Sequence, residues 1–254
     1  MKEIRTQIVF IICFLAAWQI VYQMQAFPEL LFPSLKEIGS SFVTGFKDNS
    51  LLEYTLYSMS LIVKGMGIAV VLAFVFSGVA VVSKVFHSIY NLIVSICDLL
   101  PGVALLPVVI VIVGVRPEVI VFLVVHAVLW PLSRNLLDGF QAVPSIYVEA
   151  GRNMGLRGMR LLASVDLPAS MSYIVSGIKV CWARAWRGLI SAEMIFGLAS
   201  CPGIGLYINQ MRTNLYNAEM YATLIVIIII GLIVQYGILS PIERNTVVKW
   251  GMSN

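Results

Sequence analysis

Long apolar stretches recur along this chain, separated by shorter segments that contain charged residues, glycine and proline. A helix needs about 20 mostly apolar residues to cross the hydrocarbon core of a bilayer. The pattern therefore predicts an all-α integral membrane protein with about six transmembrane helices. The predicted spans are Ile8–Met24, Ser58–Val82, Ile89–Val115, Val119–Leu137, Ser172–Leu198 and Ala222–Leu239.

The first span resembles a signal peptide, because Lys2 and Arg5 precede its apolar run. That run continues through Trp18 and Tyr22, however, and no clean small-x-small cleavage site follows it. We therefore expect a retained membrane anchor.

Composition supports the membrane assignment. Of the 254 residues, 59% are apolar and only 12% are charged, and the mean hydropathy is +0.92. A soluble domain carries about 25% charged residues, so this chain lacks the polar surface that water requires. These values exclude a secreted enzyme, a nucleic-acid-binding protein and a disordered tail. The four cysteines lie far apart without nearby histidines, so no disulfide framework and no metal site is expected.

The distribution of basic residues predicts the orientation in the membrane. With the N-terminus inside, the inner segments contain Lys2, Arg5, Lys84, Arg134, Arg152, Arg157, Arg160, Arg244 and Lys249. The outer segments contain Lys36, Lys47, Arg116 and Arg212. Because basic residues favour the cytoplasmic side, we expect both termini in the cytoplasm. The longest polar loop, Ser133–Met171, is then cytoplasmic too.

Proline and glycine interrupt the third span. Pro101 and Pro107 flank Gly102, and each proline removes one helix hydrogen bond. Two interpretations stay open: a kinked helix packed inside a bundle, or a kink beside a transport path. A second interruption at residues 197–205 contains Pro202, and it predicts a short re-entrant or surface turn at the outer face.

The cytoplasmic loop contains the most informative segment, residues 144–168. Pro144 fits a helix start, with Ser145 as a possible cap. Tyr147, Ala150 and Met154 are spaced to share one helix face. Gly155 is suited to end this helix in a left-handed turn.

A second short helix is expected after it, ending at Leu167 and Pro168. The segment is either an ordinary amphipathic surface loop or a helix that docks in the groove of a soluble partner. An apolar face with small residues and mixed charges is what such docking requires.

These residues resemble a known motif. The spacing of Glu149, Ala150, Gly155, Val165, Leu167 and Pro168 is similar to the EAA loop of ABC importer permeases, with Gly151 where that family often has a second alanine. The stretch from Pro101 to Pro107 resembles the Pro-x-x-Ala-x-x-Pro element of the nitrate/sulfonate/taurine-type permeases. Further similar positions are Gly177, Lys179, Ala185, Trp186, Ala192 and Glu193, followed by PGIGLYI and the C-terminal IERNTVVKW. The arginine that the family often has near the start of the second span is absent, and Ser60 stands in its place.

The resemblance covers about Tyr57–Trp250 and implies a permease subunit with the type I ABC importer transmembrane fold. It implies an N-terminal anchor and outer-face connection over residues 1–54, a transmembrane domain over 55–245 and a cytoplasmic tail over 246–254. The ATPase-coupling loop would contain Glu149, Ala150, Gly151, Arg152, Met154, Gly155, Leu167 and Pro168.

The same resemblance implies partners in the bacterial inner membrane and on both of its sides. A second permease copy would form a homodimer, two cytoplasmic ATPase subunits would bind ATP and Mg, and an extracytoplasmic protein would deliver the solute. The chain itself contains no GxxxxGK[ST] sequence and no Gly-Lys dipeptide, so it has no P-loop of its own. We therefore expect no catalytic residue and no cofactor in this chain.

Ionisable residues inside a span are costly and mark candidate sites. On a helical wheel, Arg184, Arg187, Gly188 and Ser191 share one side of the fifth span. With Asp98 and Pro101 they form our candidate translocation path for an anion. The alternative is that the arginines pair with Asp98, Glu193 or helix carbonyls and hold the bundle together. We expect His126 to be a neutral, hydrogen-bonded interior residue, and Asp98 either binds a proton or pairs with a basic residue.

Three functions are compatible with a chain of this kind. The favoured one is an ABC permease for a small anion such as a sulfonate, taurine, nitrate or bicarbonate, with a vitamin-precursor heterocycle as the alternative solute. An ion-coupled secondary transporter would use Asp98 or Glu193 as its ion site, but such proteins often contain two similar halves, and only one proline-broken half is found here. A membrane scaffold would explain a docking loop but not a basic face inside a span.

Overall fold

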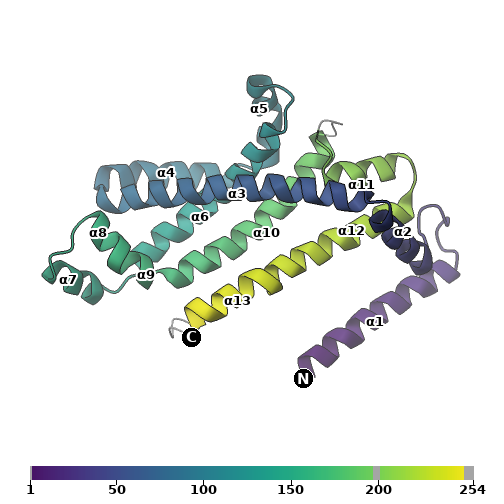
Figure 1. The fold of residues 1–254 in the computed structure, drawn as a ribbon, viewed down its shortest axis with the longest axis horizontal. Coiled ribbons are helices and arrows are strands. Elements are labelled where there is room, and N and C mark those ends of the chain that lie inside the picture. The colour runs from purple at the N-terminus through teal and green to yellow at the C-terminus, as the bar shows by residue number, and fades with distance from the viewer. Residues whose placement is uncertain (1, 197–200, 249–254) are drawn as a thin grey trace. The chain divides into compact units, whose positions relative to one another are not determined.

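A computed structural model describes residues 2–196 and 201–248, and all the regular secondary structure of that part of the chain is helical (Figure 1). Four of its helices are long and apolar enough to cross a membrane, and two bent helix pairs raise the number of spans to as many as six. This agrees with the prediction of about six spans.

The chain divides into two compact units. The first comprises Met1–Tyr57 and Glu193–Ile229, and the second comprises Ser58–Ala192 and Ile230–Asn254. The helices α3 (Ser50–Val82), α10 (Met171–Phe196) and α12 (Asn217–Leu232) contribute residues to both units.

The first unit also contains α1 (Lys2–Gln23), α2 (Leu35–Lys47) and α11 (Ile204–Thr213). The α1 span is apolar and none of it is buried, which suits a helix that contacts lipid. Trp18 near its end donates a hydrogen bond from Nε1 to the carbonyl oxygen of Pro33, at 3.1 Å. The next helix begins with a capping box, in which Ser34 Oγ accepts from the Glu37 backbone and Glu37 Oε2 accepts from the Ser34 backbone.

The second unit is built around α6 (Glu118–Gln141), the most deeply buried of the candidate spans. Two glycines allow close approach of neighbouring helices. A Cβ atom on Gly65 of α3 would lie 2.5 Å from Val124 Cγ1, and a Cβ atom on Gly177 of α10 would lie 2.9 Å from Asn135 Cβ. The small residues of α3 and α10 thus seat both helices directly against α6.

The interruption predicted in the third span is a complete break. The helix α4 (Lys84–Leu99) is followed by η1 (Gly102–Leu105) and α5 (Leu106–Val113), and the two parts are bent by 91°. Leu100 and Pro101 between them have extended backbones, with ψ of 121° and 122°. The sequence predicts an interruption at this place, but not its extent. A kinked helix would stay helical through the bend, whereas here two extended residues separate two helices. Figure 1 shows α5 directed away from α4.

The segment after α6 forms α7 (Ser145–Asn153), α8 (Met159–Leu161), η2 (Leu162–Asp166) and α9 (Leu167–Ala169). Residues Met159–Ala169 are bent by 73° relative to α10. Pro168 lies in the first turn of α9, where a proline is tolerated, so the chain bends later than predicted, near Ser170. After α12 the chain continues through η3 (Ile233–Leu239), α13 (Ser240–Glu243) and η4 (Arg244–Val248).

Several helices extend beyond their predicted apolar spans. The helix α3 begins at Ser50 and α6 ends at Gln141, because polar residues can continue a helix outside the hydrocarbon. Of the predicted turn at residues 197–205, positions 197–200 lie outside the described residues, and Gly203 is the N-cap of α11. The predicted tail 246–254 is described only to Val248.

Replacement of Gly65 by alanine tests the contact between α3 and α6. The added methyl group overlaps Val124, and overpacking of this kind costs about 1–3 kcal/mol. We expect Gly65→Ala to lower the midpoint of thermal unfolding of the solubilised permease by several degrees. Gly67→Ala on the same helix is the control, because no atom lies within 4 Å of the added methyl group. Equal midpoints for the two variants would contradict the close packing.

Candidate functional site

The helix α7 is shaped by a proline at one end and a glycine at the other. Pro144 is its N-cap, and Ser145 makes no side-chain capping hydrogen bond, so the predicted serine cap is wrong. At the other end Gly155 has φ +85°, as predicted for a left-handed turn. The backbone N–H of Gly155 donates to Arg152 O at 2.9 Å and that of Leu156 donates to Gly151 O at 3.0 Å. This pair of bonds is a Schellman motif.

One side of α7 packs on the residues that follow it. Gly151 is buried, and a Cβ atom there would lie 2.7 Å from Leu161 Cδ1 and 2.9 Å from Val165 Cγ2. Leu162 in turn reaches α3, where a Cβ atom on Gly78 would lie 3.2 Å from Leu162 Cδ2. The segment 145–169, which we call the coupling segment, is thus in direct contact with a membrane-spanning helix.

The rest of the α7 surface, beside the packed glycine, is exposed and partly apolar. Ile146 is 68% exposed, Tyr147 56% and Met154 81%, and Glu149 and Ala150 beside them are also exposed. Tyr147, Ala150 and Met154 border a cavity of about 810 Å³ that extends to Val165 and Pro168. A cluster of exposed large apolar side chains on a polar segment is characteristic of a protein interface.

A second cavity, of about 560 Å³, lies between the coupling segment and the ends of α3 and α6. Arg152, Arg157 and the buried Asp166 line it. Burial raises the pKa of the Asp166 carboxyl, and the charge of Arg152 partly opposes that rise. Arg152, which sequence analysis assigned to the coupling loop, therefore faces an acidic group of the same segment.

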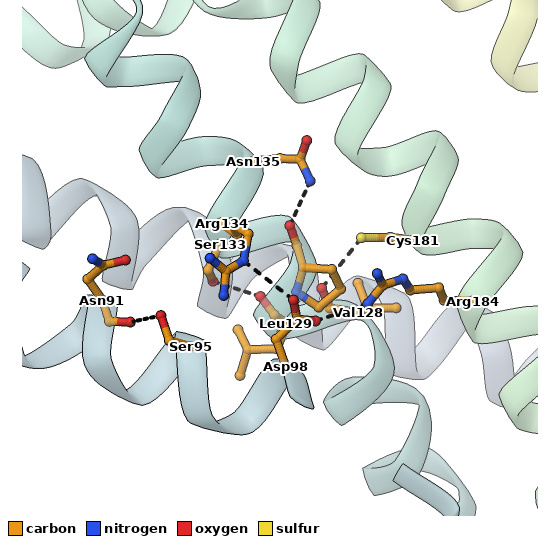
Figure 2. Close-up of polar contacts among 11 residues, drawn as sticks. Asn91, Ser95, Asp98, Val128, Leu129, Ser133, Arg134, Asn135, Cys181 and Arg184 are labelled. Carbon is orange, nitrogen blue, oxygen red and sulfur yellow. Dashed lines mark hydrogen bonds and ion pairs between the residues drawn. The ribbon is translucent and has the colours of Figure 1, made fainter. Parts of the chain in front are cut away.

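An ionic cluster joins three helices next to the break in the third span (Figure 2). Asp98, near the end of α4, receives a hydrogen bond at its Oδ1 from Arg184 Nη1 of α10, at 2.9 Å. Its Oδ2 receives one from Arg134 Nε of α6, at 3.4 Å. The carboxylate is only 17% exposed, whereas the two arginines are 41% and 46% exposed. One half-buried negative charge thus holds two positive charges at the edge of the unit.

Side-chain donors surround the proline inside α6 in the same region. Pro131 has no N–H group, so the carbonyl oxygen of Ala127, four residues earlier, loses its helix donor, and side chains donate to other carbonyls nearby. Asn135 Nδ2 donates to Pro131 O at 2.8 Å, Ser133 Oγ donates to Leu129 O at 2.7 Å, and Cys181 Sγ donates to Val128 O at 3.5 Å (Figure 2). Tyr90 Oη lies 2.6 Å from Ser133 Oγ and ties α4 to the same turn.

The helix α10 has the two faces that the helical wheel predicts. Arg184, Arg187 and Ser191 are exposed and Gly188 is half-buried, whereas Trp182 and Trp186 are buried and stack with 5.7 Å between ring centroids. Within the described residues Arg187 has no ion pair. Pro101, Gly188, Asp98 and Arg184 line one cavity of about 250 Å³, so the structure brings together most of the residues assigned to a translocation path.

Some polar residues behave differently from the sequence prediction. Arg134 was counted only for membrane orientation, yet it pairs with Asp98. His126 lies in the interior as predicted, but the expected hydrogen bond is not found, because neither of its ring nitrogens has a partner in the described residues. The indole Nε1 of Trp130 is also buried and has no hydrogen-bond partner in the described residues, although the sequence analysis did not single out this residue. No known motif links His126 and Trp130 to a site. The one signal in the sequence is the four-residue spacing of His126, Trp130 and Arg134, which places all three on one face of α6.

Two further charged side chains of α10, Glu193 and Lys179, have partners on neighbouring helices. Glu193 is 1% exposed and its Oε2 accepts from the backbone N–H of Gly205, at 2.9 Å, in the first turn of α11. Lys179 Nζ donates to Glu243 Oε2 at 2.7 Å and ties α10 to α13. Both Glu193 and Glu243 belong to motifs that sequence analysis singled out, and both serve to hold helices together.

Comparison with known proteins gives a consistent result. Residues 65–244 match the model of the family described as binding-protein-dependent transport system inner membrane component. The chain is 24% identical over 238 residues to a taurine transport system permease protein of Escherichia coli, which covers 91% of this chain and 85% of the relative.

Two cyanobacterial proteins are similar over comparable lengths. A bicarbonate transport system permease protein of Synechococcus elongatus is 22% identical over 206 residues, covering 81% of this chain and 71% of the relative. A nitrate import permease protein of Synechocystis is 24% identical over 211 residues, covering 83% and 73%.

The family match spans most of the chain and includes the broken third span, the coupling segment and α10. The chain therefore belongs to the family of binding-protein-dependent transport system inner membrane components, the multi-pass permease subunits of ABC importers.

Proposed function

We propose that this chain forms the translocation path of an ABC importer for a small anionic solute, such as a sulfonate, taurine, nitrate or bicarbonate. The observation that carries the proposal is the exposed basic face of α10. Arg184 is 46% exposed and Arg187 is exposed as well, although both lie in a helix that forms part of a candidate span.

Charged side chains cannot face lipid at low cost. A charge at the centre of a span costs roughly 2.5–3.5 kcal/mol on insertion scales, so such residues face a bundle interior or a water-filled path. A positively charged lining favours anions through Coulomb attraction, which is strong where protein and lipid lower the dielectric constant. The relatives named for taurine, bicarbonate and nitrate support the same class of solute.

The working complex contains more than this subunit. We propose that two copies form a homodimer, that an extracytoplasmic solute-binding protein delivers the solute, and that two cytoplasmic ATPase subunits bind ATP and Mg. The absence of a P-loop sequence in this chain supports the assignment of ATP hydrolysis to a partner. The exposed apolar face of α7 supports its docking in a groove of that partner, on the cytoplasmic side of the membrane.

The mechanism is alternating access. Closure of the ATPase pair moves the two docked coupling segments together, and each segment transmits the motion to α3 through the contact of Leu162 with Gly78. The bundle then opens outward to accept the solute, and hydrolysis returns it to the inward-facing state. The coupling segment transmits force and no residue of this chain is catalytic.

An ion-coupled secondary transporter is less well supported. Its ion site would be Asp98 or Glu193. Asp98 is bound to two arginines, and Glu193 accepts a backbone hydrogen bond. Both carboxylates therefore already have partners, and the chain matches the family of binding-protein-dependent transport system inner membrane components.

Charge reversal of Arg187 tests the basic face. Because Arg187 has no ion pair in the described residues, Arg187→Glu leaves the fold intact, but it places a negative charge in the path. We expect anion uptake into proteoliposomes to fall at least tenfold, equivalent to about 1.4 kcal/mol or more, with normal assembly of the complex. The control Arg244→Glu reverses an exposed charge on η4 and should keep full uptake. Normal uptake by Arg187→Glu would argue against this face as the path.

Charge reversal of Glu149 tests the docking of α7. Glu149 is exposed and makes no ion pair within the described chain, so Glu149→Lys should leave the permease folded. We expect it to reduce solute-stimulated ATP hydrolysis and uptake together, because the contact with the ATPase is altered. Glu118→Lys, at the exposed start of α6, is the matched control. Unchanged stimulation in Glu149→Lys would mean that this part of α7 does not contact the ATPase.

The support beneath α7 is tested by the size of the side chain at position 151. In Gly151→Ala the added methyl group overlaps only the ends of the Leu161 and Val165 side chains, which can shift, so we expect a stable complex. Gly151→Leu places a larger group in the same space and should displace α7. The measurement is the amount of ATPase subunit that co-purifies with the permease. Equal recovery for both variants would refute the role of this contact.

A further inference from the structure

The cavity beside the ionic cluster lies where the third span is broken. It has a volume of about 250 Å³ and its lining includes Asp98, Pro101, Gly102, His126, Trp130 and Arg184. Leu99 at its edge is 83% exposed and Arg184 is 46% exposed, so the cavity is accessible from outside the unit. Non-helical backbone at membrane depth is tolerated where it lines a cavity that contains water or ligand.

Two side chains in this cavity present polar atoms that have no partner in the described residues. His126 is 92% buried (8% exposed), and its Nδ1 and Nε2 are both without a hydrogen bond. Trp130 Nε1 is buried and also has none. The two rings meet edge to face, with 6.1 Å between centroids, so their polar atoms belong to one small region. Buried polar groups in native proteins almost always have a partner, which indicates that a molecule in the cavity supplies one.

The charges of the region identify what kind of molecule fits. Asp98 carries one negative charge and is already bound by Arg134 and Arg184, so the three side chains together carry a net positive charge. The Arg184 guanidinium has five N–H donors and only Nη1 contacts Asp98. Trp130 Nε1 can only donate, and a neutral His126 offers one donor and one acceptor. A cation finds no free carboxylate here, whereas the oxygens of an anion find several donors.

We propose that this cavity is a binding site for a small oxyanion within the permease itself, with Arg184 as its charge partner and Trp130 and His126 as hydrogen-bond partners. The inference rests on the proposed function, because it assigns a binding site for the transported solute on the proposed translocation path. The Asp98 carboxylate limits affinity through repulsion, so the anion is held while the permease is closed and released easily when the helices separate.

The test is equilibrium dialysis of isotope-labelled nitrate, bicarbonate and taurine against the permease–ATPase complex in lipid nanodiscs, without the binding protein. We expect saturable binding of at least one probe. Trp130→Phe removes the N–H donor but keeps an aromatic ring, and it should raise the Kd at least fivefold. Gly102→Ala places a methyl group 3.5 Å from His126 Nδ1, an ordinary contact that the fold accommodates, and should weaken binding similarly by narrowing the cavity.

The matched control is Trp182→Phe, because Trp182 is a buried tryptophan of α10 that does not line the cavity. It should bind as the unmodified complex does. Equal Kd values in all variants would overturn the proposed site. The site would also be overturned if a complex that imports one of the probes shows no saturable binding of any of them. Neither result would contradict the proposed function. If proteoliposomes with the binding protein import none of the probes, the proposed solute class is wrong and the site proposal falls with it.

Discussion

The hydrocarbon core of a bilayer offers no hydrogen bonds, so every polar group inside it must find its partner within protein or in a water-filled path. Much of the second unit follows from this constraint. Near Pro131 of α6, the side chains of Ser133, Asn135 and Cys181 donate to backbone carbonyl oxygens of that helix. The charge of Asp98 is matched by arginines from two other helices. His126 and Trp130, whose ring nitrogens have no partner in the described residues, line a cavity.

The same constraint separates the roles of charged residues in this chain. Charges with an internal partner hold helices together, as Asp98 does for α4, α6 and α10, and as Lys179 and Glu243 do for α10 and α13. The charge of Arg187, without such a partner in the described residues, is available to a solute or to another subunit. Gly65 and Gly177 pack α3 and α10 closely against α6. In the mechanism that we propose, the contact of the coupling segment with α3 transmits the motion of the ATPase to the membrane helices.

Sequence reasoning succeeded where one local rule decides the outcome. Apolar length predicted the spans, and the glycine rule for helix ends predicted the positive φ of Gly155. It failed where the outcome depends on residues that are distant in sequence. The pairing of Arg134 with Asp98 joins two helices, and the 91° break at Pro101 depends on α5 leaving the line of α4. The expected hydrogen bond of His126 is not found in the described residues, where this side chain lines a cavity.

The central proposal is that α7 binds an ATPase subunit and transmits its motion to this permease. A photo-crosslinking amino acid at position 154, where the Met154 side chain is 81% exposed, tests it directly in the assembled complex. The account predicts a cross-link between position 154 and the ATPase subunit, absent when the label replaces the buried Leu161. A cross-link to the solute-binding protein, or to lipid alone, would contradict it.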